Sequence, residues 1–309
     1  MSVHPARRLA AVQSPVIPVL GGLIRATPGT LSLGQGMVNW GPPPQVHQAL
    51  AEVLAEVQVQ AREDSAGVDE SGPADPCLDL YGPVAGDAPL LDRLRRQLRE
   101  EDDFDLEPSE LLVTAGSNMA FSALMQVLLD PGDEVLLPVP WYFNHEMAVR
   151  LAGGVPVSVR FPGGELDPGR LAAQVSPRTR AIVTVSPNNP SGAVVPRPAL
   201  EAINQLCASR GLVHLHDEAY HLFTYGGAAH WSPGSVPGSG AHTVTLRSFS
   251  KAYGMAGWRL GHVVVPRPLL ADLAKIQDTV LIAPPRITQV AALAALEAGS
   301  AWCRRRIAA

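Results

Sequence analysis

Short apolar runs alternate with segments of helical periodicity over most of the chain. The apolar runs predict buried strands, at residues 111–114, 134–139, 181–186, 212–216, 242–246 and 262–265. Apolar residues at helical spacing predict helices between and after these strands, at residues 117–129, 200–209, 269–280 and 287–298. Buried strands that alternate with helices are typical of an α/β fold with three α-β-α layers, in which helices cover both faces of a mostly parallel sheet.

The first 110 residues have a different pattern. Three consecutive prolines at 42–44 precede a predicted helix at residues 45–59. The acidic segment 61–76 contains Gly and Pro and predicts a surface loop. Four leucines lie on one face of an amphipathic helix predicted at residues 87–100. Neither an internal repeat nor a coiled-coil heptad pattern is present.

Composition excludes several classes of function. The 309 residues are 46% hydrophobic and 17% charged, with a net charge of −5 that gives no basic face for nucleic acid. No apolar run approaches the roughly 18 residues of a membrane span, and no apolar signal segment follows Arg7 and Arg8. Cys77, Cys207 and Cys303 are odd in number and far apart, which predicts neither a disulfide framework nor a metal site. We therefore expect a soluble, cytoplasmic α/β enzyme or binding domain.

Polar residues follow several of the predicted strands, where open α/β sheets bind their ligands. The turn Gly116-Ser117-Asn118 opens a helix, and it is either a phosphate site or an ordinary helix cap. The amides in segment 186–192 belong either to a turn or to an oxygen-binding site. Asp217 ends an apolar strand, where a buried carboxylate needs a cationic partner.

The segment after the strand at 242–246 combines a lysine with an arginine. Lys251 lies among small residues in the sequence SFSK, and Arg259 follows eight residues later. Alone, Lys251 is either a solvated loop residue or an amine nucleophile. The guanidinium of Arg259 is able to bind a phosphate through two parallel hydrogen bonds. Together, the anion site, the acid, the amide, the phenol of Tyr220 and the amine match the needs of pyridoxal 5'-phosphate.

The order of these motifs resembles the class I/II aminotransferases of the fold-type I pyridoxal-phosphate-dependent enzymes. The motifs are AGSN at 115–118, SPNNPSG at 186–192, DEAY at 217–220 and SFSKAYGMAGWRLG at 248–261. The resemblance extends over residues 31–298. It implies the large domain of these transferases, a pyridoxal 5'-phosphate cofactor, and transfer of an amino group from an amino acid to a 2-oxo acid.

The resemblance also implies a role for each matching residue. Lys251 would form the Schiff base and move the substrate proton, while Asp217 would pair with the pyridine nitrogen. Asn189 and Tyr220 would bind the ring 3-oxygen, so the implied catalytic residues are Lys251, Asp217 and Tyr220. The implied phosphate ligands are Gly116, Ser117, Asn118, Ser248 and Arg259.

Four further positions follow from the resemblance. Tyr142, rather than its neighbour Trp141, is expected to stack on the cofactor ring, with a packed core aromatic as the alternative. Gly36 lies in the segment that closes over substrate, and Gly36 and Asn189 are the expected substrate contacts. Tyr81 stands where relatives send a tyrosine into the phosphate site of the neighbouring subunit, which implies a homodimer with shared active sites. His145 has an open role, and a packed or surface histidine is favoured over a catalytic one.

The sequence departs from the family pattern in two places. Dicarboxylate-specific relatives carry an arginine shortly before Asn-Pro-Pro, but residues 278–282 before Ala-Pro-Pro contain none, which disfavours an aspartate-only enzyme. Arg286 is either a substitute or a surface residue. Relatives also continue past residue 298 into a C-terminal small domain with a carboxylate-binding arginine.

These departures determine the expected domain organisation. We expect residues 1–45 to form an N-terminal lid segment, 46–298 the cofactor-binding domain, and 299–309 the start of a connecting helix, with an incomplete small domain. Two alternatives to an aminotransferase stay open: a non-catalytic protein that binds pyridoxal phosphate, and a lyase or decarboxylase on the same fold.

Overall fold

The computed structural model describes residues 4–32, 34, 36–66 and 78–309. The helices are α1 (Val16–Ala26), α2 (Pro44–Ala66), α3 (Ala88–Asp102), α4 (Ser117–Leu128), α5 (Phe143–Leu151), α6 (Pro168–Gln174), α7 (Arg197–Arg210), α8 (Leu270–Leu281) and α9 (Arg286–Ala308). The strands are β1 (Ser109–Thr114), β2 (Glu134–Pro138), β3 (Val155–Val159), β4 (Thr179–Val185), β5 (Val213–Asp217), β6 (Thr243–Ser248) and β7 (Gly261–Pro266).

The described strands form one seven-stranded sheet in the order β1-β7-β6-β5-β4-β2-β3. Neighbours from β6 to β3 pair in parallel, whereas β7 runs antiparallel to both β6 and β1. The predicted α/β fold with a mostly parallel sheet is therefore confirmed. Since β4, β5 and β6 are parallel, their carboxyl ends meet at one edge of the sheet, and this edge is where the polar motifs of the sequence come together.

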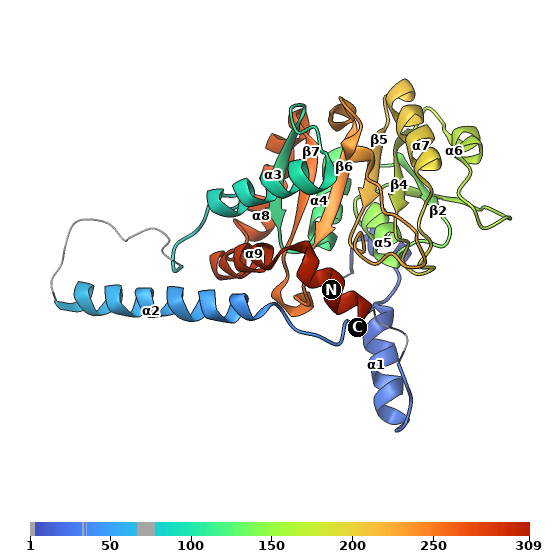
Figure 1. Ribbon diagram of the computed structural model, residues 1–309. Helices are drawn as coiled ribbons and strands as arrows, with labels where there is room; N and C mark the ends of the chain where they lie inside the picture. Colours follow the sequence, from blue (N-terminus) through green and yellow to red (C-terminus); the bar gives the residue numbers. More distant parts are fainter. Residues whose placement is uncertain (1–3, 33, 35, 67–77) are drawn as a thin grey trace.

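Helices cover both faces of the sheet (Figure 1). Leu111 and Val113 of β1 pack with α3 and α9, while Leu112, between them, packs with α4 on the other face. Further along the sheet, Leu136 and Ile182 pack with α6 and α7. Alternate residues of each strand therefore enter different cores, which is why these strands appear in the sequence as continuous apolar runs.

Two helices project from this three-layered body (Figure 1). Helix α1 has no buried residue. Helix α2 continues to Ala66, so the prediction of a loop beginning at residue 61 is wrong for residues 61–66. The residues Ala61, Arg62 and Glu63 are good helix formers, and the first glycine after them is Gly67. The rest of the predicted loop, 67–76, lies outside the described residues.

Helix α9 is interrupted at Gly299, where φ is 74° and ψ is 168°. Cys303, beyond the interruption, is buried in the core that α3 and α9 share. No helix in the described part of the chain is long and apolar enough to span a bilayer.

Candidate active site

A cavity of about 250 Å³ opens at the carboxyl ends of β4, β5 and β6. It is bounded by the start of α4, the loop after β6 and the N-terminal segment. Most of the residues singled out by the sequence line it: Gly36, Ser117, Asn118, Tyr142, Asn189, Asp217, Tyr220, Ser248, Lys251 and Arg259. Residues as far apart in the chain as Gly36 and Lys251, 215 positions, thus converge on one site, and parallel strands bring them together by presenting their carboxyl ends at one edge.

Lys251 lies beneath the N-terminal segment. Its Nζ donates a hydrogen bond of 2.7 Å to the carbonyl oxygen of Gly36. A Cβ at Gly36 would lie 2.6 Å from the hydroxyl of Tyr220, so the segment approaches this closely only because residue 36 is glycine. Burial, and then the positive charge of Arg259, lower the pKa of Lys251. A larger share of its amine is therefore uncharged and nucleophilic than in an exposed lysine.

Asp217 faces the cavity from the end of β5 and is 6% exposed. Its Oδ1 accepts a hydrogen bond from the backbone of Ala219, and its Oδ2 lies 3.1 Å from Nε2 of His145. His145 is 2% exposed, and its ring stacks on Phe121 with centroids 4.1 Å apart. His145 is therefore a packed histidine, as the sequence favoured, and its contact with the candidate catalytic carboxylate is a feature that the sequence did not predict.

The predicted phosphate turn is built around Gly116. This residue has φ of 85°, and a Cβ there would lie 2.6 Å from Nη2 of Arg259. The first N–H groups of α4, beginning at Ser117, have no partner within the helix, and such groups bind anions. The Ser248 hydroxyl accepts a hydrogen bond from the backbone N–H of Ser250, which holds it at the cavity wall.

The two tyrosines that line the cavity are Tyr142 and Tyr220. Tyr142 lines it, and the side-chain amide of Asn144 donates a hydrogen bond of 2.8 Å to its hydroxyl. Trp141 instead packs against the core of α4 and α5 and lines a separate cavity. Burial, with Tyr142 and Asp217 nearby, raises the pKa of Tyr220 to about 12, so its phenol keeps its proton and can donate a hydrogen bond.

Tyr81 is the predicted site residue that the structure places away from this cavity. It is 81% exposed and does not contribute to the lining. Residues 1–3, 33 and 35 of the predicted lid segment lie outside the described residues. The sequence also missed several lining residues, namely Ile17, Met37, Phe143, Val185, Ala219, Ser250 and Ala256. Most of these are apolar or small, and such residues have no distinctive chemistry to mark them in a sequence.

The residues present fit pyridoxal 5'-phosphate. A carboxylate and a lysine amine line the same cavity, and the space that a Cβ at Gly116 would fill lies against the guanidinium of Arg259. Asp217 would hold the pyridine nitrogen, Lys251 the aldehyde, and Arg259 with Ser248 and the start of α4 the phosphate.

Comparison with known proteins agrees with this assignment. Residues 34–303 match the family described as aminotransferase class I and II. The chain is 34% identical over 312 residues to the aromatic aminotransferase ISS1 of Arabidopsis thaliana, an alignment that covers 98% of this chain and 72% of the relative. It is 38% identical over 219 residues to an aspartate/prephenate aminotransferase of Thermus thermophilus, covering 70% of this chain and 56% of the relative.

Solved structures show the same likeness. A double mutant of Thermus thermophilus aspartate aminotransferase superposes with a TM-score of 0.86 at 31% identity, covering 100% of this chain and 77% of that one. The chain belongs to the class I and II aminotransferases, whose members depend on pyridoxal 5'-phosphate. The predictions of the family, the fold class and the cofactor are confirmed.

Proposed function

We propose that this chain transfers an amino group from an amino acid to a 2-oxo acid. The observation that supports this most strongly is the pair formed by the Lys251 amine and the Asp217 carboxylate, which line one cavity with a phosphate-binding turn. When bound, pyridoxal 5'-phosphate supplies an electron sink for the negative charge that proton removal leaves on the substrate Cα. The chain's own residues position the reacting groups and move the proton.

Lys251 acts twice in this mechanism. Its Nζ would hold the cofactor aldehyde and, once freed by a substrate amine, would act as the base that takes the proton from Cα and delivers it to the cofactor carbon. Its lowered pKa suits both tasks, since both need the uncharged amine. Asp217, held in place by its contact with His145, would pair with the pyridine nitrogen and favour its protonated form. The N-terminal segment at Gly36 covers Lys251 and limits access of water.

The sequence contains a matched control for Lys251, because Lys275 is the only other lysine. Lys275 lies on α8, with its side chain 75% exposed and paired with Asp272. We expect Lys251→Ala to abolish the visible absorbance of bound cofactor and its covalent trapping by borohydride, and Lys275→Arg to retain both. The proposal would be contradicted if Lys275→Arg lost the covalent trapping of cofactor, or if Lys251→Ala retained it.

A panel of amino acids distinguishes transamination from its alternatives. We expect donors to convert the bound cofactor to its pyridoxamine form, with release of the matching 2-oxo acid. Binding without conversion favours a non-catalytic protein, and release of carbon dioxide or ammonia favours a decarboxylase or lyase. We propose that preferred donors have uncharged side chains. This is supported by the lining residues Ile17, Met37 and Phe143, and by Arg286, which lies outside the cavity and pairs with Asp87.

Assembly, location and domain organisation are further proposals. We propose a homodimer in which Tyr81 reaches the phosphate site of the second copy, supported by the exposure of this tyrosine. Sedimentation of the protein at several concentrations tests it. Free buried thiols at Cys207 and Cys303 support a reducing, cytoplasmic location, which cell fractionation tests. We also propose residues 46–298 as the cofactor-binding unit, 1–45 as the lid-bearing segment and 299–309 as the start of a connecting helix.

A further inference from the structure

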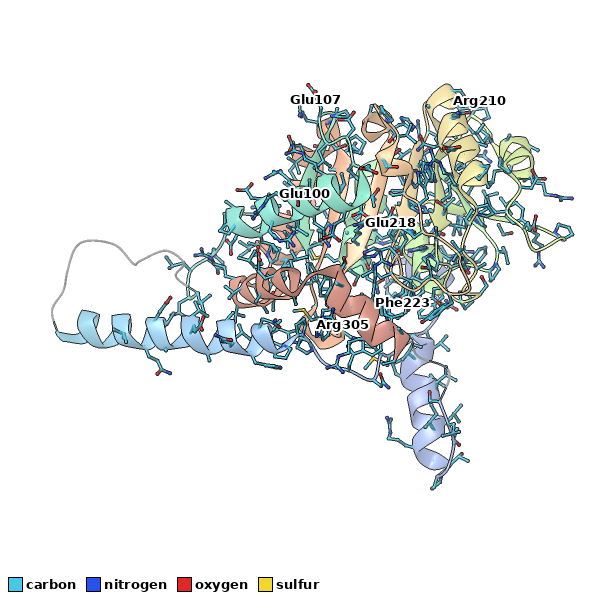
Figure 2. The ribbon with its side chains drawn as sticks, in the orientation of Figure 1. Glu100, Glu107, Arg210, Glu218, Phe223 and Arg305 are labelled. Atoms are coloured by element: carbon cyan, nitrogen blue, oxygen red, sulfur yellow. The ribbon has the colours of Figure 1, made fainter. Side chains whose placement is uncertain are left out.

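A buried ion pair lies on the face of the sheet opposite the cavity. Glu218 Oε2 accepts a hydrogen bond of 2.8 Å from Nε of Arg247 and lies 2.7 Å from Nη2 of the same guanidinium. Arg247 also donates from Nη1 to Asp102, at the end of α3, over 2.6 Å. Glu218 is fully buried and Arg247 is 3% exposed. Figure 2 shows Glu218 within the body of the molecule, close to the end of β5.

Each member of this pair is the chain neighbour of a candidate cofactor ligand. Glu218 comes directly after Asp217, the last residue of β5, and Arg247 comes directly before Ser248, the last residue of β6. Successive side chains of a strand point to opposite faces, so Asp217 and Ser248 line the cavity while Glu218 and Arg247 meet behind it. The backbone N–H of Glu218 bonds to the carbonyl of Leu246 over 2.9 Å. The ion pair therefore joins the two strands at the point where both reach the cavity.

The cost of burying these charges indicates that they do more than stabilise the fold. Two histidines lie near the carboxylate, with Nε2 of His216 at 3.8 Å and Nε2 of His230 at 3.4 Å from Glu218. Burial lowers the pKa of His216 to about 4, so this histidine does not neutralise Glu218. A buried ion pair is often no more stabilising than apolar residues of similar volume, because desolvation opposes the attraction. What an ion pair adds over apolar packing is a defined geometry.

We propose that Glu218 and Arg247 are positioning residues, which hold β5 and β6 so that Asp217 and Ser248 stay at a fixed separation. This inference rests on the proposed function, in which Asp217 holds the pyridine nitrogen and Ser248 the phosphate. The cofactor would carry its pyridine nitrogen and its phosphate on one ring, so how well it contacts both ligands at once would depend on the separation of Asp217 and Ser248. The network thereby sets how much the phosphate adds to affinity, without touching the cofactor.

The test compares pyridoxal 5'-phosphate with pyridoxal, which lacks the phosphate. In the double variant Glu218→Leu/Arg247→Met, apolar side chains replace the pair, and we expect a melting temperature near that of the wild type. We expect the affinity for pyridoxal 5'-phosphate, divided by the affinity for pyridoxal, to fall on the order of tenfold. This fall corresponds to about 1.4 kcal/mol of lost phosphate binding. General destabilisation would weaken both ligands equally and leave the ratio unchanged.

A second variant and a control complete the design. Arg247→Lys keeps the charge but loses the fork, and we expect a smaller fall in the same ratio. Arg178→Met breaks a 2.6 Å pair with Glu134 at the opposite end of the sheet, and we expect an unchanged ratio. If the folded double variant, or Arg247→Lys, has the same ratio of affinities as the wild type, the inference is overturned. Failure of the wild type to bind either ligand through Lys251 instead overturns the proposed function.

Discussion

Gly116 combines an unusual backbone conformation with close contact to a candidate phosphate ligand. Its φ of 85° and ψ of 159° lie in a region that only glycine occupies readily, and a Cβ would lie 2.6 Å from Arg259. We expect Gly116→Ala to lower the free energy of unfolding by about 1–3 kcal/mol through backbone strain. We also expect a loss of pyridoxal phosphate affinity on the order of tenfold, because a displaced Arg259 loses a charge-assisted hydrogen bond. Urea unfolding and cofactor titration measure the two effects.

Gly132 is the matched control for that substitution. It also has positive φ, 91°, but a Cβ there meets nothing within 4 Å. We expect Gly132→Ala to lower stability through strain alone and to leave cofactor affinity unchanged. Equal losses of affinity in the two variants would show that Arg259 is not the reason for glycine at position 116.

At the residue level, the sequence predicted most of the cavity but not how its charges are paired. It indicated that the buried carboxylate of Asp217 needs a cationic partner. In the structure, His145 contacts Asp217, and Arg247 pairs with the next carboxylate, Glu218. His145 comes from α5, 72 positions earlier in the chain, and only the packing of α5 on the sheet brings it there. Such contacts depend on tertiary structure and have no local sequence pattern.

Within α9, Gly299 separates two helical segments. Its φ of 74° and ψ of 168° are again nearly exclusive to glycine, and a Cβ there would meet nothing within 4 Å. We expect Gly299→Ala to lower the free energy of unfolding by about 1–3 kcal/mol, or to straighten the helix and expose the buried thiol of Cys303. Thermal unfolding and thiol labelling in a Cys77→Ser background distinguish these results.

A glycine inside α1 serves as the comparison for Gly299. Gly22 lies within a regular helix and has open space around it. We expect Gly22→Ala to stabilise the protein slightly, by about 0.4–1 kcal/mol, because alanine restricts the unfolded chain. If Gly299→Ala behaves in the same way, the interruption in α9 is not a requirement of the fold.

The elements that the sequence predicted are those with continuous apolar runs or a strong helical face. Strand β3 was missed because it contains a proline, Pro156, and a serine, Ser158, so it has no continuous apolar run. Only its last residue, Val159, is buried. Helix α1 was missed because it has no face buried against the body. The antiparallel direction of β7 was also not predicted, since apolar content determines burial but not the direction in which a strand runs.

For the molecule as a whole, buried histidines predict a loss of stability in mild acid. Burial lowers the pKa of His216 to about 4 and that of His262 to about 3, against about 6.5 in an unfolded chain. Between these values only the unfolded state binds the protons. The contribution of these two histidines to the free energy of unfolding should therefore be fully present above about pH 6.5 and be lost below it, by about 1.4 kcal/mol per pH unit for each histidine.

His262→Phe is the variant that tests this pH dependence. Neither ring nitrogen of His262 has a hydrogen-bond partner, so phenylalanine removes a titrating group without breaking a hydrogen bond. Urea unfolding at a series of pH values between about 7 and 5 should show a slope smaller by about one proton in the variant. The same slope in both proteins, or a flat profile in the wild type, would contradict the prediction.

The position of Pro156 has a consequence for how copies of this chain can assemble. Strand β3 is an edge of the sheet, and it bonds to β2 through neighbouring residues such as Val155, whose N–H donates to Asp133. The backbone nitrogen of residue 156 therefore points away from the sheet, and as proline it carries no hydrogen to donate. An incoming strand finds this edge short of a donor, so growth into a continuous intermolecular sheet is opposed there. At this edge, association between copies is left to helices and loops, whose side chains determine which partner fits.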